Sequence, residues 1–292
     1  MTEPRLIVEV RWGKLAGTKA AIPPGGSLVV GRTDLSDLVV PHDTELSGSH
    51  FELSWSEGVC ALRDLESLSG TKVGGEAVRE AQVPHGGWIH AGETDFMVYV
   101  EGRTPPKKKE LDAAEAAGER ARLDAAHEAL KFLRQKAEEA PLYAVVDGAR
   151  DNRILAVLRE HLERQQSLYD GLQGEVIEDI APYLVGPMLP DSGLLERLAM
   201  EGWGKRWGIW CTSDEKFVEV RRHWRRFLMV DLEESGERVY FRFYDPGVLR
   251  VFWGTCDTAQ LTALSEDLTG LFVESKEGAV VALPLVQGAG DA

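Results

Sequence analysis

An arginine and a serine in two separate loops are the residues of this sequence best suited to hold an anion. Arg32 directly follows a β-prone run, and Ser47 lies shortly before the next one. A guanidinium presents paired N–H donors in one plane and a hydroxyl adds another, a combination that suits a phosphate group. Gly70 permits a tight turn between later strands, and the hydroxyl of Thr71 can fix that turn. The sequence therefore predicts a phosphate site built on Arg32 and Ser47.

Three aspartates stand beside glycine or proline at predicted strand ends, where α/β enzymes place catalytic groups: Asp147, Asp170 and Asp245. Aspartate is also the common turn and capping residue, and we interpret these three in that way. The motifs of nucleotide-binding loops, zinc proteases and serine hydrolases do not occur, and the histidines are scattered. We therefore expect a non-catalytic protein without a metal or other cofactor. The alternative is a hydrolase or transferase that uses Asp147 or Asp245.

The charge balance argues against several classes of function. The 292 residues include 33 lysines and arginines against 48 aspartates and glutamates, which gives a net charge of −15. A nucleic-acid-binding protein normally carries a basic stripe, and an anionic membrane does not attract an acidic surface. We therefore expect no nucleic-acid partner and no membrane insertion.

The location of the protein is also suggested by composition. The longest apolar run, 279–286, is too short to span a bilayer, and the first residues lack the basic start and apolar core of a signal peptide. The three cysteines are widely separated and fit neither a disulfide framework nor a zinc site. These features predict a cytoplasmic protein.

The elements that must position the candidate residues change in character along the chain. From residue 6 to residue 100, short β-prone runs alternate with glycine pairs, which predicts an all-β sandwich over 1–102. Residues 103–140 begin with prolines and lysines and continue with Ala, Glu, Lys and Arg, with only a thin apolar stripe. That composition predicts a charged helical linker, either a solvated helix or a semi-rigid spacer.

Strands and helices alternate in 141–292, which predicts an α/β domain with a mixed sheet. Asp151 or Asn152 can cap the first of its helices. The helices are expected at 153–165, 192–201 and 214–227, and the strands at 142–146, 208–211 and 239–244. The chain is thus predicted to be multidomain.

Separated blocks in the first part form a family pattern. They are Gly31-Arg32, Ser47-Gly48-Ser49-His50, Asp64, and Ser69-Gly70-Thr71 followed by Gly74-Gly75. Their spacing, with the strands around them, resembles the forkhead-associated (FHA) family over about residues 5–102. The resemblance implies a β-sandwich whose loops at one end bind phosphothreonine peptides, with a phosphothreonine-containing protein as partner.

The FHA resemblance also implies roles for single residues. Arg32 and Ser47 would hold the phosphate, while Gly31 and His50 would shape the loops, as would Gly70 and Thr71 in the later block. Ser69 would contact the peptide, but it stands where the family usually has an asparagine that grips the peptide backbone. This departure leaves a second interpretation open, in which the fold is retained and docks a partner without phosphate.

Aromatic and acidic blocks follow one another in the third part. They are Tyr143–Ala149, Leu168–Gly171, Ala181–Val185, Gly202–Ile209, Arg221–Phe227 and Phe241–Arg250. The series resembles, from about Leu142 to Ser275, the domain-of-unknown-function family found in effector adaptors (chaperones) of type VI secretion systems. The resemblance implies a non-catalytic protein that holds a secreted effector and helps to load it onto the VgrG spike, sometimes with a PAAR tip protein. A fused FHA domain fits that setting, because type VI systems are often regulated by threonine phosphorylation.

Two pairs of side chains in the third part are candidates for contact with a partner. Trp203 and Trp207 are either packing residues or exposed aromatic anchors, and Arg222 and Arg225 belong either to a solvated helix face or to a docking surface for an acidic partner. The apolar stripe of the same helix is expected in the core: Phe217, Val220, Trp224 and Phe227. We expect an adaptor, and the alternative is a phosphopeptide-binding scaffold unrelated to secretion. Neither the effector, the phosphorylated partner nor the oligomeric state follows from the sequence.

Overall fold

The computed structural model describes residues 3–11, 15–104, 113–169, 178–231 and 237–286. The chain divides into two compact units, one formed by Met1–Pro105 with Arg159–Arg164 and the other by Pro106–Leu158 with Gln165–Ala292. Each unit has its own hydrophobic core residues, in one main cluster in the first unit and in two clusters in the second. None of the helices in the described stretches is long and apolar enough to cross a membrane.

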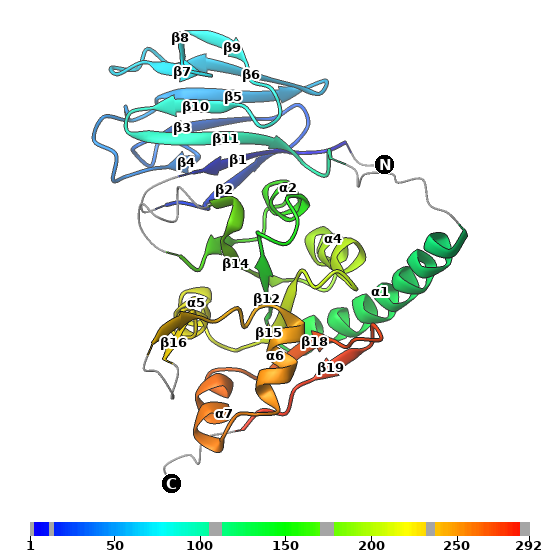
Figure 1. Cartoon of the computed structure of the whole chain (residues 1–292). Coiled ribbons are helices and arrows are strands. Elements are labelled where there is room, and N and C mark those ends of the chain that lie inside the picture. The colour runs from blue at the N-terminus through cyan, green and yellow to red at the C-terminus, as the bar shows by residue number, and fades with distance from the viewer. Residues whose placement is uncertain (1–2, 12–14, 105–112, 170–177, 232–236, 287–292) are drawn as a thin grey trace. The chain divides into compact units, whose positions relative to one another are not determined.

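The first unit is a sandwich of two sheets (Figure 1), as predicted. One sheet has the strand order β2-β1-β11-β10-β7-β8 and the other has the order β4-β3-β5-β6-β9. The short pair β3–β4 is parallel, and the other pairs are antiparallel. The strands are β1 (Leu6–Val10), β2 (Lys19–Ile22), β3 (Ser27–Gly31), β4 (Leu38–Val39), β5 (Phe51–Ser56), β6 (Val59–Asp64), β7 (Thr71–Val73), β8 (Glu76–Val78), β9 (Glu80–Gln82), β10 (Trp88–Ala91) and β11 (Thr94–Val100).

Strand β5 shows why the two sheets of the first unit pack together. Its side chains alternate between buried and less buried positions, so that Phe51, Leu53 and Trp55 point into the core. The ring of Phe51 meets that of Phe96 in the opposite sheet edge-to-face, with the centroids 5.5 Å apart. The loops that join these strands are therefore anchored on a close-packed frame.

The second unit is built on one sheet with the strand order β13-β14-β12-β15-β18-β19, and each of these pairs is antiparallel. A separate hairpin is formed by β16 and β17. The α/β class is confirmed. The elements are α1 (Ala113–Glu139), β12 (Leu142–Asp147), α2 (Arg153–Arg159), β13 (Gln165–Ser167), the 3₁₀ helix η1 (Glu178–Ile180), β14 (Pro182–Met188), α4 (Gly193–Gly202), β15 (Gly208–Thr212), α5 (Phe217–Arg225), β16 (Met229–Asp231), β17 (Arg238–Tyr240), α6 (Pro246–Trp253), α7 (Thr258–Ser265), β18 (Gly270–Glu274) and β19 (Val280–Ala282).

Helices cover both faces of this sheet, and the central strand β12 is buried along its whole length. Leu142, Ala144 and Val146 point into one core, which they share with α1, α2 and α4. Tyr143 and Val145 point into a second core on the other side, which contains residues of α5, α6 and α7. A strand that is buried on both faces has no polar face, and this explains the continuous apolar run at its start.

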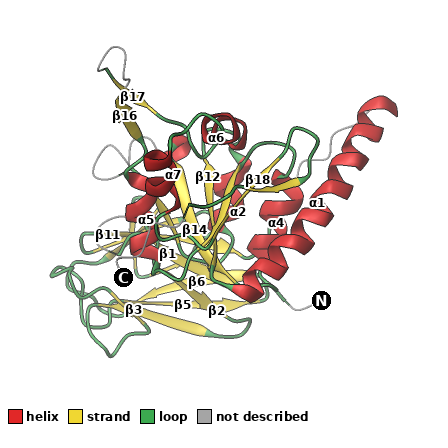
Figure 2. Ribbon diagram, turned by 90° about the horizontal axis from the view of Figure 1, so that it is seen from below, coloured by secondary structure: helices red, strands yellow, loops and turns green. Residues whose placement is uncertain are grey.

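Helix α1 lies within the region predicted as a charged linker, but it is not solvated on all sides. Its narrow apolar stripe is buried and packs beside α4 (Figure 2). The buried residues of the stripe are Ala126, Ala129, Leu130 and Leu133. Arg122 strengthens this contact, because its Nη1 donates to the backbone oxygens of Met200, at 3.0 Å, and Trp203, at 2.8 Å, at the carbonyl end of α4.

Two boundaries differ from the sequence prediction. The helix that begins at Arg153 ends at Arg159, and Gln165, the last residue expected in it, belongs to strand β13 instead. The strand expected over 239–244 ends at Tyr240. Helix α6 was not predicted, since its start reads as a turn. The side chain of Asp245 caps it, and Pro246 occupies its first turn, where no backbone N–H is needed.

Helix α5 confirms the predicted stripe, with Phe217, Val220 and Trp224 buried and Trp224 stacked on Phe243 at 5.0 Å. Beside this stripe lies His223, which is 1% exposed and accepts a hydrogen bond at Nδ1 from Arg226. Burial, with the neighbouring Arg226 charge, lowers the pKa of His223 to about 4. The imidazole is therefore neutral at physiological pH.

The neutral state of His223 predicts acid sensitivity. The unfolded chain takes up a proton at this residue near pH 6.5, whereas the folded protein does so only near pH 4. Acidification through this interval should therefore lower the free energy of unfolding of the second unit, by up to roughly 3 kcal/mol from this group alone. Urea unfolding at a series of pH values, in the parent and in His223→Gln, measures the effect. The variant should show a shallower pH dependence, and equal slopes would contradict the prediction.

Candidate functional site

Arg32 and Ser47 lie next to each other at one end of the first unit. Arg32 directly follows β3, Ser47 lies in the loop that leads to β5, and these two strands pair in one sheet. The backbone N–H of Arg32 donates to the carbonyl oxygen of Ser47, at 2.9 Å. Because this bond joins the two loops directly, it places both side chains at the same corner of the sandwich.

The polar atoms of this pair have capacity for a ligand. The hydroxyl oxygen of Ser47 accepts a hydrogen bond from the backbone N–H of Leu68, at 3.0 Å, so its own proton is available to donate. The side chain of Arg32 is exposed, and within the described residues it has no hydrogen bond or ion pair. An exposed guanidinium beside a hydroxyl donor is suited to a phosphate or carboxylate group.

His50 joins the loop before β5 to the loop between β6 and β7. Its fully buried ring accepts from the backbone N–H of Ser47 at Nδ1, at 3.0 Å, which leaves the proton on Nε2 to donate to the carbonyl oxygen of Gly70, at 3.2 Å. Its own carbonyl oxygen accepts from the backbone N–H of Leu65, at 2.9 Å. The imidazole therefore holds the loops in place and does not face solvent as an acid or base.

Close approaches and turns explain the other motif residues. A Cβ on Gly31 would come within 2.2 Å of the carbonyl oxygen of Gly48, so this position admits only glycine without rearrangement. Gly70 has a φ of +76°, which favours glycine. The hydroxyl of Thr71 donates to Asp64, and although burial acts to raise the pKa of Asp64, hydrogen bonds from Ser67 and Thr71 lower it. These contacts fix the turn that carries Gly70.

Ser69 belongs to the same group of loops but is turned toward its own chain. Its exposed hydroxyl donates to the carbonyl oxygen of Glu45, at 2.9 Å. Two leucines beside the loops were not identified as site residues from the sequence: Leu35 is 81% exposed and Leu68 is 96% exposed. The available signal was a leucine flanked by polar residues, as in Asp34-Leu35-Ser36 and Ser67-Leu68-Ser69.

The predicted tryptophan anchors of the second unit are not exposed. Trp203 is 3% and Trp207 4% exposed, and both belong to the core shared with α1 and α4. The indole Nε1 of Trp203 donates to the carbonyl oxygen of Gly278, at 2.7 Å. A Cβ on Gly202 would lie 2.7 Å from the ring of Trp207, so glycine at this position makes room for it. Of the two interpretations that the sequence left open, the burial of both indoles agrees with packing and not with exposed anchors.

The two predicted arginines lie on α5 but have different surroundings. Arg222 is exposed, with 68% of its side chain accessible, and pairs with Glu219 on the same helix. Arg225 is partly buried, and its Nε donates to the carbonyl oxygen of Leu168, at 2.8 Å. Arg222 therefore belongs to the surface, whereas Arg225 joins α5 to the chain beyond β13.

Asp147 and Asp245 have structural partners. Both are buried, with exposures of 0% and 3%, and Asp147 accepts from Arg242 Nε, at 2.8 Å. Asp245 pairs with Arg150 and Arg206 and caps α6 through the backbone N–H of Gly247. Burial acts to raise the pKa of Asp245, but Arg206 and that amide lower it. The two carboxylates thus balance the charges of arginines, and Asp245 also caps a helix. Asp170 lies outside the described residues.

One group in the described part of the chain has the spacing of a metal site, namely His223, Glu266 and Asp267, with ligand atoms within 4.8 Å of one another. Arg226 Nη2 donates both to His223 Nδ1, at 3.0 Å, and to Glu266, at 2.8 Å. The positive charge that a metal ion would bring to these side chains is therefore already supplied by the guanidinium of Arg226.

The role of His50 makes a prediction about stability. His50→Ala should leave the backbone N–H of Ser47 and the carbonyl oxygen of Gly70 without partners and open a cavity, so the free energy of unfolding of the first unit should fall by about 2–4 kcal/mol. Scanning calorimetry of the full chain measures this loss. The matched control is His90→Ala, because His90 lies at the surface and pairs only with Asp95. Similar unfolding temperatures for both variants would show that His50 does not hold the loops.

In comparisons with known proteins, two family models match separate parts of the chain. Residues 28–92 match the model of the FHA domain, and residues 142–263 match the model described as "Domain of unknown function (DUF4123)". Over 73 residues the chain is 36% identical to the FHA domain-containing protein FhaA of Mycobacterium tuberculosis, a match that covers 25% of this chain and 14% of that protein.

Solved structures of FHA domains also match. One, from a study of phosphothreonine-dependent FHA domain interactions, is 27% identical, with 35% of this chain and 99% of that chain covered and a TM-score of 0.30. Another, the FhaA FHA domain complexed with the intracellular domain of another protein, is 29% identical, with 32% and 98% covered and a TM-score of 0.29. The chain therefore carries an FHA domain, followed by a domain of the DUF4123 family.

Proposed function

We propose that this protein is a non-catalytic adaptor of a type VI secretion system that acts in the cytoplasm. Its FHA domain binds a phosphothreonine-containing protein for recruitment or regulation. Its second unit holds a secreted effector and helps to load it onto the VgrG spike, with or without a PAAR protein. The observation that carries the proposal is the pair of Arg32 and Ser47, with donors uncommitted, in an FHA domain joined to a DUF4123 domain.

The phosphate half of the proposal is supported by electrostatics. Phosphothreonine carries nearly two negative charges, and in an acidic protein it requires local donors that compensate them. Arg32 supplies a charge and planar donors, and Ser47 supplies a hydroxyl proton, on loops that His50 holds in place. A site that is ordered before binding avoids part of the entropy cost of association.

The adaptor half is supported by the DUF4123 match and by the roles of the buried residues. The aspartates that an enzyme would use are buried and paired with arginines, which supports a structural role for them. The exposed Arg222 on α5 offers one charged contact to an acidic partner. Genes for a spike protein and a toxin beside this one would favour the secretion adaptor over a scaffold with another partner.

Removal of the guanidinium should weaken phosphopeptide binding. Charge-assisted hydrogen bonds contribute about 1.5–3 kcal/mol each, so Arg32→Ala should raise the dissociation constant at least roughly tenfold. Isothermal titration of a phosphothreonine peptide library, with the full chain, measures the change. Arg63→Ala is the matched control, because Arg63 is an exposed arginine of β6 that pairs with Glu52. No binding by the parent, or equal binding by both variants, would leave the interpretation in which the FHA fold docks a partner without phosphate.

Reversal of charge on α5 should weaken cargo binding. If Arg222 belongs to the rim of the effector contact, Arg222→Glu should stay folded, retain several-fold less of the effector encoded beside this gene, and bind the remainder with less dependence on salt. Pull-down with the full chain at two salt concentrations measures this. Arg63→Glu makes the same charge change in the FHA domain and should have no effect, and Arg32→Ala should also keep the cargo. Normal binding by Arg222→Glu would move the interface elsewhere, and a parent that binds neither the toxin nor the spike would refute the adaptor assignment.

A further inference from the structure

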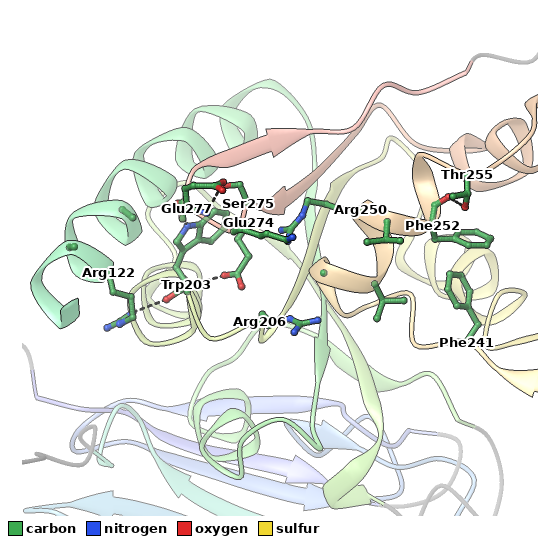
Figure 3. Close-up of a pocket in the computed structure, with 18 residues that line it drawn as sticks. Arg122, Trp203, Arg206, Phe241, Arg250, Phe252, Thr255, Glu274, Ser275 and Glu277 are labelled. Carbon is green, nitrogen blue, oxygen red and sulfur yellow. Dashed lines mark hydrogen bonds between the residues drawn. The ribbon is translucent and has the colours of Figure 1, made fainter. Parts of the chain in front are cut away.

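The second unit contains a groove of about 920 Å³ between several of its segments (Figure 3). One side is formed by Ala121 to Ala125 of α1, and the opposite side by α6 from Gly247 to Phe252. The chain from Trp203 to Arg206, the turn from Glu274 to Gly278, and the single residues Phe241 and Thr255 complete it. Helix α1 and this turn lie outside residues 142–263. The groove is therefore formed partly by residues that the family model does not match.

The lining of the groove is mainly apolar and includes one strongly exposed side chain. Val248, Val251 and Phe252 come from α6, and Trp203 contributes a face of its otherwise buried indole. Val251 is 69% exposed. An exposed valine at the edge of a concave apolar surface is typical of a place where another molecule covers it.

Charged groups around this apolar surface favour an acidic occupant. The lining contains Arg122, Arg206, Arg250 and Lys276 against Glu274 and Glu277, so cations predominate there although the whole chain carries −15. Arg122 is committed to α4, Arg206 to Asp245, and Glu274 to the backbone N–H of Gly204, at 2.6 Å. Arg250 and Lys276 are therefore the cations that remain for a ligand.

Arg250 has a donor that no residue of the described chain satisfies. It reaches from α6 toward Glu274 and the inside of the groove (Figure 3). Its Nη1 is buried and has no hydrogen-bond partner among the described residues. A buried N–H of a guanidinium without an acceptor is costly. Arg250 as a whole is only partly buried, so a carboxylate from outside can pair with the accessible part of this side chain.

We propose that this groove binds a peptide segment of the cargo protein, which places apolar side chains against Val251 and Phe252 and a carboxylate on Arg250. The inference rests on the proposed function only in naming the cargo as the source of the segment. The groove is bounded by two helices and a turn and has a mainly apolar lining, which suits a stretch of polypeptide, and its cations favour an acidic one.

A defined probe tests the groove without knowledge of the effector. A phage-displayed library of random 16-residue peptides is selected on the full-length protein and depleted on Val251→Glu. We expect the selected peptides to contain large apolar residues and at least one Asp or Glu. Fluorescence anisotropy of a selected peptide should show at least tenfold weaker binding to Val251→Glu. Val218→Glu is the matched control, because Val218 is a 49% exposed valine of α5 that does not line the groove, and it should bind as the parent does.

The contact with Arg250 is tested by a double-mutant cycle. Arg250→Gln should weaken the acidic peptide about tenfold but should hardly affect the same peptide with its Asp or Glu changed to the amide. The proposal would be overturned if the effects of Arg250→Gln and of the change in the peptide were additive. It would also be overturned if the selected peptides contained no carboxylates, or if they bound Val251→Glu as well as they bind the parent. An effector that binds the full chain but is not displaced by the selected peptide would also overturn it, while the adaptor function would stand. A protein that binds no effector would refute that function, and the peptide titrations would still decide about the groove.

Discussion

Strand β12 has no exposed side chain, so each residue that it contributes must be matched by a helix on one side of the sheet or the other. This constraint explains the architecture of the second unit. Leu142 and Ala144 require the layer formed by α1, α2 and α4, and Tyr143 and Val145 require the layer formed by α5, α6 and α7. The strand ends in Asp147, whose buried charge Arg242 compensates.

The same demand for compensation accounts for the polar clusters near the end of β12. Asp245 starts α6 and pairs with two arginines, one of which, Arg206, also lines the groove. A Cβ on Gly247 would lie 2.4 Å from that guanidinium, so the absence of a side chain at the start of α6 allows Arg206 to lie there. In the FHA domain, His50 does comparable work by satisfying backbone groups of two loops. In both units, buried polar residues determine the shape of a binding surface without contacting a ligand themselves.

The positions of Arg32 and Ser47 in the FHA domain could be predicted from the sequence, because the strands next to these residues pair directly with each other. Arg32 and Ser47 flank strands β3 and β5, which are adjacent in one sheet, so spacing alone brings them together. Burial in the second unit could not be read in this way. A Gly-Trp-Gly pattern is the same whether its tryptophan is exposed or packed, and only the fold shows that Gly202 accommodates the ring of Trp207. Helix α6 was missed because its first residues, Asp245-Pro246-Gly247, also make an ordinary turn. The groove was beyond prediction, since residues from Ala121 to Gly278 meet there.

The packing of α1 changes what should be regarded as the second domain. The family model begins at residue 142, yet four side chains of α1 belong to the core beneath the sheet. A protein shortened to that starting point would present the apolar surfaces of α4 and β12 to water, and such surfaces promote aggregation. It would also lack one side of the groove. The structural module therefore begins with helix α1, although the charged composition of this segment resembles that of a spacer.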